Sequence, residues 1–238
     1  MAPPRALLFD VFGTLVDWRA SIARAGQALG DRLGLPPTDW AALADAWRAC
    51  YDPGLEPVRA GERAWVTLDV LHRESLDALL PAHGLEAMPG TARADLVAAW
   101  HRLDPWPDVA EGLRRLRARH LLAPCSNGHV ALQVHLARRA GLVWDAVLGA
   151  ELARTYKPRP EVYLRSVEAL GLEPPEVLMV AAHPSDLAAA ARCGLRTAWV
   201  ARPDEHGPGA GAEPPTHDVD HRADDLLALA AALDFNRG

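Results

Sequence analysis

Six residues carry side chains that could do chemistry together: Asp10, Ser126, Asn127, Lys157, His183 and Asp186. An ionised carboxylate such as that of Asp10 can act as a nucleophile and form a covalent intermediate. An ammonium group beside it would keep it ionised in a dry pocket, and a second carboxylate can act as a general acid or base. The alternative is that polar residues follow strands simply because loops are polar, but the set combines a candidate nucleophile, a lone lysine, a Ser–Asn pair and a second carboxylate.

Lys157 stands out because it is the only lysine among the 25 lysine and arginine residues. Lysine is a compact point charge with a tunable pKa, whereas arginine is a wide fork that stays charged. A sequence that otherwise uses arginine has therefore kept one ammonium group. We interpret Lys157 as functional; the alternative is a lysine that survives by chance on the surface. Asparagine is also rare, with only Asn127 and Asn236.

The elements that must position these residues alternate along much of the chain. Residues 6–12 form an apolar run interrupted by Asp10 and followed by Gly13, which predicts a buried strand with an acid at its carboxyl end. Residues 18–100 show helical spacing broken by Pro and Gly, which predicts four or five helices and no strand. Further on we expect strands at 121–125, 145–148, 177–182 and 197–200, helices at 108–119, 130–140, 160–170, 185–193 and 224–233, and an irregular loop at 202–222.

Strands that alternate with helices predict an α/β fold with a doubly wound, mostly parallel, Rossmann-like sheet. Such folds bind ligands beyond the carboxyl ends of the strands, which is where most of the polar residues named above are expected. Lys157 is expected in a connecting loop. The helical block then becomes a cap inserted after the first strand. We predict a catalytic core of residues 1–17 and 101–238 and a helical cap of residues 18–100.

The composition argues against several classes of protein. Half of the 238 residues are hydrophobic, which is too many for a disordered chain and enough for a buried core. A net charge of -6 argues against nucleic acids and anionic membranes as partners. No apolar run approaches the roughly 20 residues of a membrane helix, and residues 1–5 are too short for a signal peptide. The widely spaced Cys50, Cys125 and Cys193 predict reduced thiols, and we expect a cytoplasmic protein.

Four segments occur in a recognisable order: FDVFGTLVD at 9–17, SNG at 126–128, YKPRPEVY at 156–163 and the segment around Asp186. With them the chain resembles the haloacid dehalogenase superfamily over nearly its whole length. Within the superfamily it resembles the L-2-haloacid dehalogenase (type II) family. The resemblance implies the same Rossmann-like core and helical cap, no cofactor or metal ion, a small haloacid and water as reactants, and a homodimer.

Phe12 favours the dehalogenases over the phosphatases of this superfamily. Phosphatases carry a second Asp two residues after the nucleophile, because a phosphate ester needs a proton on its leaving oxygen. A halide leaves without a proton, and this chain has Phe12 there. Phosphoryl transfer also needs a cation held by several carboxylates, whereas residues 177–192 offer only Asp186. Both departures predict metal-independent displacement at carbon; the alternative is a degenerate phosphatase in which Phe12 only packs.

The resemblance assigns the bond-making steps to three residues. Asp10 attacks the carbon that bears the halogen and forms an ester, which water then hydrolyses at the carboxyl carbon. Lys157 is the electrostatic partner of Asp10, and Asp186 acts with it and a water in the second step. The Thr14 hydroxyl is expected to bond to Asp10, with a structural turn as the alternative. Asp17 is expected to cap a helix.

Further residues match the positions that bind the substrate in this family, and Phe12 is placed among them. Arg48, in AWRACY, matches the halide-binding arginine, and a guanidinium suits that role because it stays cationic when partly buried. Ser126 is expected to bind the substrate carboxylate, and Asn127 to donate a hydrogen bond to the leaving halide. Tyr163 is expected to line the pocket. The alternatives are a helix-face arginine, two turn residues and a tyrosine that only packs.

The segment before Asp186 departs from the better-known family pattern. His183 stands at the position of an asparagine, and Ala181 at that of a pocket serine. A histidine three residues from an aspartate can be the base that activates water, since its ordinary pKa suits neutral pH. The alternative is a histidine that only makes hydrogen bonds, as the asparagine does; both interpretations stay open. Of Trp18, Trp65, Trp100 and Trp106, we expect one or two to touch the substrate and the rest to fill the cap.

We predict a hydrolase that dehalogenates short (S)-2-haloacids through an aspartyl ester, without a metal ion and with inversion. One alternative is defluorination of fluoroacetate by the same chemistry, with His183 as an extra donor to fluoride. A second is a Mg²⁺-dependent small-metabolite phosphatase, and a third is a non-catalytic protein that kept the fold. The physiological substrate need not be halogenated, because a fold does not fix a function.

Overall fold

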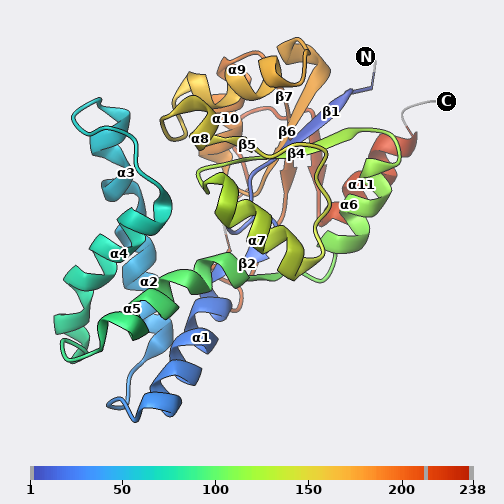
Figure 1. Ribbon diagram of the computed structural model, residues 1–238. Coiled ribbons are helices and arrows are strands. Elements are labelled where there is room, and N and C mark those ends of the chain that lie inside the picture. The colour runs from blue at the N-terminus through green and yellow to red at the C-terminus, as the bar shows by residue number, and fades with distance from the viewer. Residues whose placement is uncertain (1–2, 212–213, 236–238) are drawn as a thin grey trace.

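The computed structural model describes residues 3–211 and 214–235 of the chain (Figure 1). Its centre is a six-stranded sheet in which each strand pairs in parallel with its neighbours. The predicted doubly wound α/β fold with a parallel sheet is therefore confirmed. In spatial order the strands are β5 (Leu148–Gly149), β4 (Leu121–Ser126), β1 (Ala6–Phe9), β6 (Val177–Ala181), β7 (Arg196–Val200) and β8 (His221–Ala223).

Strand β1 lies in the middle of the sheet and is buried on both faces. Leu7 and Phe9 belong to one apolar cluster, and Ala6 and Leu8 belong to the other. Successive side chains of a strand point to opposite faces, and a parallel sheet is usually covered on both. The polar residue that follows, Asp10, therefore emerges at the carboxyl edge of the sheet.

Helices pack against both faces of the sheet (Figure 1). Three of the helices that follow residue 105 contribute leucines to the cluster of Leu7 and Phe9, and two others pack with Ala6 and Leu8. The first three are α6 (Val109–Arg117), α7 (Val130–Ala140) and α11 (Leu226–Phe235); the other two are α9 (Pro160–Ala169) and α10 (Pro184–Arg192); the short α8 (Ala150–Ala153) precedes α9.

A lobe of helices lies beside the sheet and is joined to it through β2 (Val16–Asp17) and β3 (Asp104–Pro105), which pair antiparallel (Figure 1). Asp17 caps the first helix of this lobe, as predicted, because its carboxylate accepts the backbone N–H of Ala20 at 2.9 Å. The predicted boundaries of core and cap stay a prediction. We call this set the helical lobe: α1 (Trp18–Leu33), α2 (Trp40–Ala49), α3 (Tyr51–Arg59), α4 (Leu68–Leu79), η1 (Leu80–His83), α5 (Gly90–Val97) and η2 (Ala98–Arg102).

Two segments differ from the elements expected from the sequence. The strand expected at 145–148 is reduced to β5, because Asp145 turns across the end of β4 and bonds to both backbone groups of Leu122. The stretch 202–222 was expected to be irregular, but its last two residues belong to β8, which pairs with β7. A strand of three residues is too short for its alternation to be visible in a sequence.

The three cysteines are free thiols, as predicted. Burial raises the pKa of the Cys125 thiol to about 12, so this thiol stays protonated and unreactive at neutral pH. Among the described residues, no helix combines the length and the hydropathy needed to cross a bilayer.

Candidate active site

The carboxyl ends of β1 and β6 bring two carboxylates to one ammonium group. Asp10 follows β1, and Asp186 lies in the first turn of α10, which follows β6. Lys157 Nζ lies 2.8 Å from Asp10 Oδ1 and 2.6 Å from Asp186 Oδ2. All three side chains are buried. The structure thus brings together the three residues to which the bond-making steps were assigned.

This arrangement keeps Asp10 ionised. Burial opposes a charged carboxylate, but the charge of Lys157 and the bonds to Lys157 and His183 outweigh it and hold the pKa of Asp10 below its ordinary value. Burial also opposes the ammonium, yet the two carboxylates raise the pKa of Lys157. Burial and the charge of Asp10 raise the pKa of Asp186 despite Lys157. Asp10 is therefore suited to be the nucleophile, and Asp186 is the better proton acceptor.

Thr14 holds the second oxygen of the Asp10 carboxylate. Its hydroxyl donates to Asp10 Oδ2 at 2.7 Å and accepts the backbone N–H of Ala182 at 2.9 Å. The backbone N–H of Asp10 donates to the carbonyl of Val180 at 3.0 Å. Thr14 thus combines both roles considered from the sequence, because it positions the carboxylate and ties its loop to the end of β6.

His183 connects Asp10 to a buried acid, Glu205. Its Nδ1 lies 3.1 Å from Asp10 Oδ2, and its Nε2 lies 2.9 and 3.0 Å from the two oxygens of Glu205. Glu205 is fully buried and also accepts the indole N–H of Trp18 at 3.2 Å. Burial opposes the imidazolium, but hydrogen bonds to both carboxylates raise the pKa of His183 to about 10. At neutral pH both ring nitrogens therefore donate, and the ring has no lone pair with which to act as a base.

Glu205 reaches the site because Gly13 leaves room for it. Gly13 has φ +82°, and a Cβ atom there would lie 2.1 Å from Glu205 Oε1. Both the left-handed backbone and the close approach favour glycine. Sequence reasoning missed Glu205, which lies within the stretch expected to be an irregular loop. The only available signal was an acid in a loop that follows the carboxyl end of a strand.

A cavity of about 640 Å³ opens over Asp10 and is lined by residues of the sheet edge and of the helical lobe. None of Trp18, Trp65, Trp100 and Trp106 lines it; Trp18 and Trp100 are fully buried and stack on each other instead. Thr14 does not line the cavity, because it is fully buried. The predicted site residues in the wall are Asp10, Phe12, Arg48, Asn127, Lys157, Tyr163, His183 and Asp186.

Arg48 presents its guanidinium to this cavity, with no acidic partner among the described residues. The guanidinium carbon lies 4.2 Å from the ring centroid of Tyr51 and 5.8 Å from that of Trp18. Its buried Nε has no hydrogen-bond partner within the part of the chain that the structure describes. A buried donor without a partner is costly, and an anion in the cavity would supply one. Phe12 adds an apolar wall, with its ring edge-on to that of Trp100 at 5.8 Å.

Asn127 and Tyr163 direct polar groups at the cavity. Asn127 Oδ1 accepts the backbone N–H of Lys157 at 2.8 Å, which assigns the amide oxygen and leaves the NH₂ group to donate elsewhere. The Tyr163 hydroxyl donates to Asp186 Oδ1 at 2.5 Å and so orients that carboxylate. Ser126 is different, because it is fully buried and its hydroxyl accepts the N–H of Gly128 at 3.0 Å. Its predicted contact with a substrate carboxylate stays a prediction.

The donor atoms that could hold a metal ion lie away from this cavity. At the carboxylates of Asp10 and Asp186, the ammonium of Lys157 occupies the position between the two acids. Within residues 3–211 and 214–235, one group of three metal-binding side chains has donor atoms within 4.8 Å of one another. It consists of Asp69, His101 and His129.

A parallel sheet with a buried, charge-paired aspartate at the carboxyl end of its first strand is an arrangement suited to a hydrolase with a carboxylate nucleophile. A family model described as haloacid dehalogenase-like hydrolase matches residues 4–194, and the chain belongs to this family. The resemblance based on the four sequence segments is thereby confirmed.

Two solved structures and one curated relative are especially similar. A defluorinating L-2-haloacid dehalogenase is 44% identical with a TM-score of 0.93, and the match covers 97% of this chain and 95% of that chain. An L-2-haloacid dehalogenase is 46% identical with a TM-score of 0.93, over 98% and 99% of the two chains. The (S)-2-haloacid dehalogenase 4A of Burkholderia cepacia is 30% identical over 210 residues, which is 83% of each chain.

Proposed function

We propose that the protein hydrolyses the carbon–halogen bond of short (S)-2-haloacids. The observation that carries the proposal is the Asp10 carboxylate, which is buried, held ionised by Lys157 and His183, and exposed to the cavity. Phe12 lines that cavity where a phosphatase would need a proton donor. The similarity to proteins named as 2-haloacid dehalogenases supports the same chemistry.

The first step forms an ester between Asp10 and the substrate. Asp10 Oδ2 accepts hydrogen bonds from Thr14 and His183, whereas Oδ1 accepts one from Lys157. Oδ1 therefore has the freer lone pair and is the attacking atom. It bonds to the carbon that carries the halogen, the carbon–halogen bond breaks, and the halide leaves with both electrons. This displacement inverts the carbon.

The second step cleaves the ester with water. Asp186, whose pKa is raised, takes a proton from the water that attacks Cγ of Asp10. Negative charge then develops on Oδ2, where the imidazolium of His183 and the hydroxyl of Thr14 already donate. The hydroxy acid leaves with the proton from Asp186, and the Asp10 carboxyl, whose pKa is lowered, releases the remaining proton. We therefore infer that His183 stabilises the oxyanion.

The anionic groups of the substrate have donors waiting in the cavity wall. Arg48 offers a guanidinium that has no acidic partner in the described part of the chain, and Asn127 offers its NH₂ group. A developing halide or a carboxylate is stabilised by such donors because water is largely excluded. Arg48 comes from the helical lobe and Asn127 from the end of β4. We propose that the helical lobe is a cap that completes the site.

Halide release from (S)- and (R)-2-chloropropionate in the presence of EDTA tests this function. We expect release from the (S) form alone and formation of the (R)-2-hydroxy acid. Fluoroacetate and chloroacetate run in parallel, because the relative that is 44% identical is described as defluorinating. Fluoride release would support defluorination of fluoroacetate as the function. Absence of halide release, with Mg²⁺-dependent phosphate release from an ester, would refute the proposal in favour of a phosphatase.

Substitution of Glu205 tests the role of the charged His183. Glu205→Gln removes a carboxylate that raises the pKa of His183, so we expect about a 10-fold to 100-fold loss of turnover, as for other groups that orient a reacting residue. His183 is charged below its raised pKa of about 10, and its stabilising contribution is lost as the pH rises through that value. The alkaline decline in activity should move to lower pH in the variant.

Glu62→Gln, at an exposed position of the helical lobe, is the matched control for the lost charge. It should leave both the rate and the pH profile unchanged. A Glu205→Gln enzyme with a lower rate but an unchanged alkaline limb would indicate that Glu205 acts only through packing, and the oxyanion role of His183 would be rejected.

We also propose a cytoplasmic homodimer. The free thiols support a reducing compartment, and the resemblance to the L-2-haloacid dehalogenases supports the dimer. Light scattering on the purified protein should give twice the mass of 25.7 kDa. A monomer at micromolar concentration would contradict the dimer.

A further inference from the structure

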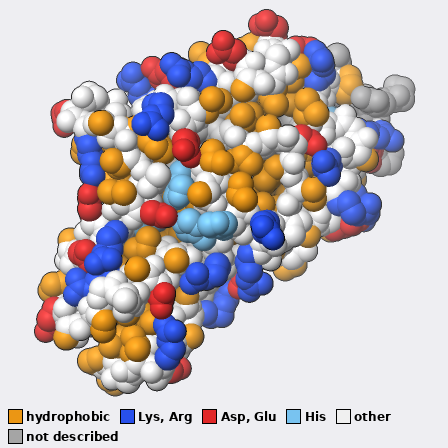
Figure 2. Space-filling model, in the orientation of Figure 1, with side chains coloured by type: hydrophobic (Ala, Val, Ile, Leu, Met, Phe, Trp, Pro, Cys, Tyr) orange, Lys and Arg blue, Asp and Glu red, His pale blue; other side chains and the backbone are white. Residues whose placement is uncertain are grey.

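Histidines gather where the helical lobe meets the core, outside the cavity over Asp10. Figure 2 shows them as a pale blue patch at the junction of the two parts. Asp69 comes from α4 and His101 from η2, both in the helical lobe. His129 is the residue before α7, and His135 lies within that helix of the core. The group is therefore built from three elements that the chain brings together only on folding.

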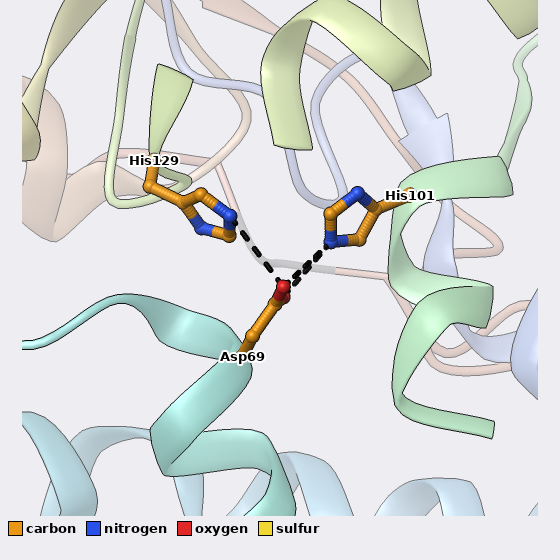
Figure 3. Close-up of side chains that lie close together, drawn as sticks. All are labelled: Asp69, His101 and His129. Carbon is orange, nitrogen blue, oxygen red and sulfur yellow. Dashed lines mark hydrogen bonds and ion pairs between the residues drawn. The ribbon is translucent and has the colours of Figure 1, made fainter. Parts of the chain in front are cut away.

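Three donor atoms in this group have the spacing of ligands around one metal ion (Figure 3). His101 Nε2 lies 2.9 and 3.0 Å from the oxygens of Asp69, and His129 Nε2 lies 3.5 Å from Asp69 Oδ2. Ligands about 2.0–2.2 Å from a tetrahedral zinc ion lie about 3.3 Å from one another. The two spacings to Asp69 match this edge to within about 0.4 Å, and the three donor atoms all lie within 4.8 Å of one another. Imidazole nitrogen and carboxylate oxygen are both ordinary ligands of zinc.

The hydrogen bonding of His129 is incomplete without a cation. The ring is buried, and its Nδ1 has no partner among residues 3–211 and 214–235. Its Nε2 is too far from Asp69 for a good hydrogen bond. A neutral imidazole ring carries one lone pair, on either Nδ1 or Nε2. If that lone pair is on Nε2, it faces a carboxylate oxygen, which is unfavourable unless a cation lies between them. A metal ion at this point would pair with both atoms.

His135 supplies the outer support that metal-binding histidines usually have. Its Nδ1 lies 3.0 Å from Nδ1 of His101, so one of the two nitrogens must donate to the other. When His101 donates from Nδ1, its Nε2 lone pair is directed at Asp69 and is available to a metal ion. Ligating histidines typically donate their second nitrogen in this way, which fixes the ring.

The group also has an access route. A cavity of about 890 Å³ is lined by Asp69, His101 and His135, together with residues of α5 and α7. This cavity is separate from the one over Asp10 and shares no lining residue with it. A fourth ligand, such as water, could therefore reach the ion from solvent, as in zinc sites with three protein ligands.

We propose that Asp69, His101 and His129 bind one Zn²⁺ ion that ties the helical lobe to the core. Asp69 and His101 belong to the lobe, whereas His129 follows the loop that carries Asn127 into the active-site cavity. Ligation would fix α4 against the start of α7. The ion takes no part in bond making, so this proposal stands independently of the proposed dehalogenation.

Zinc binding by the whole protein, first stripped with a chelator, tests the site. We expect one Zn²⁺ per chain by calorimetry, and a rise in Tm of about 5–10 °C at a 100-fold excess over Kd. Co²⁺ should report the geometry through the visible absorption of a tetrahedral complex. Asp69→Ala and His129→Gln should each abolish the stoichiometric binding and the Tm rise, whereas His83→Gln, a lobe histidine outside the group, should keep both.

Three results would overturn the proposal. The first is no Zn²⁺ binding by the natural chain, and the second is unchanged binding in both His129→Gln and Asp69→Ala. The third is a Co²⁺ spectrum of octahedral type, which would indicate adventitious surface binding. Circular dichroism of the metal-free variants verifies that they fold, and His101→Gln gives a third variant if one of them does not.

Discussion

Replacing Asp10 by Asn should abolish halide release, with a loss of about 10⁴-fold or more in kcat, as for other enzymes that lose their nucleophile. Asparagine keeps the shape of the side chain, but its amide is a far weaker nucleophile than a carboxylate. The partners of the carboxylate remain, since Lys157 still pairs with Asp186. The loss would thus report the missing nucleophile rather than a collapsed site. Halide release under saturating substrate measures it.

The covalent step can be tested directly. A single turnover of the natural enzyme in H₂¹⁸O should place ¹⁸O in the Asp10 carboxylate, because water attacks Cγ of the ester, and peptide mass spectrometry locates the label. Asp17→Asn is the matched control, since Asp17 caps α1 and lies outside the cavity. It should retain activity and labelling. Label found only in the hydroxy acid would show that water attacks the substrate carbon directly and would refute the ester.

Lys157→Met should remove both activity and stability. The change leaves the buried carboxylates of Asp10 and Asp186 without their shared cation, and breaking a buried ion pair from one side costs about 3–5 kcal/mol. We expect a lower free energy of unfolding in urea. Turnover at pH 7 should fall about 10³-fold or more, because less Asp10 is ionised and the transition state loses a nearby positive charge.

The contribution of Lys157 to stability and activity should depend on pH in a defined direction. Lys157 helps to hold the pKa of Asp10 below its ordinary value, so the stability it provides is present above that value and lost as the pH falls. Without Lys157 the pKa of Asp10 rises, and the acid limb of the residual activity should move to higher pH. Arg159→Met removes an exposed cation two residues away, paired with Glu161, and should change neither quantity. An unshifted acid limb in Lys157→Met would reject the electrostatic role.

Much of the catalytic centre could be predicted because its residues lie in short, local patterns. An apolar run that ends in Asp10, and a single Lys157 in an arginine-rich chain, are visible without any tertiary contact. The regular alternation of strands and helices predicts the parallel sheet, and the sheet's carboxyl edge then predicts where these residues meet. The short β5 and β8 were misjudged because two or three residues carry too little pattern.

The role of His183 was left open by the sequence and depends on a distant residue. Its pKa is raised by Asp10 and by Glu205. Glu205 lies in a loop without a recognisable motif and approaches only because Gly13 lacks a side chain. The sequence could not decide which tryptophans face the cavity. Packing within the lobe places Trp18 and Trp100 in its interior instead. Contacts of this kind are fixed by side-chain packing, which residue spacing along the chain does not encode.

The sequence by itself determined the fold class, because strand and helix periodicities are properties of neighbouring residues, and its resemblance to a family predicted Asp10 as the nucleophile and Lys157 as its partner. Only the tertiary structure decided which groups share charge and space. It placed Glu205 behind His183 and assembled Asp69, His101 and His129 from separate elements. Among the residues that the structure describes, it also left Arg48 without an acidic partner. Electrostatic and metal-ligand interactions act over a few ångströms in space, and that proximity exists only once the chain has folded.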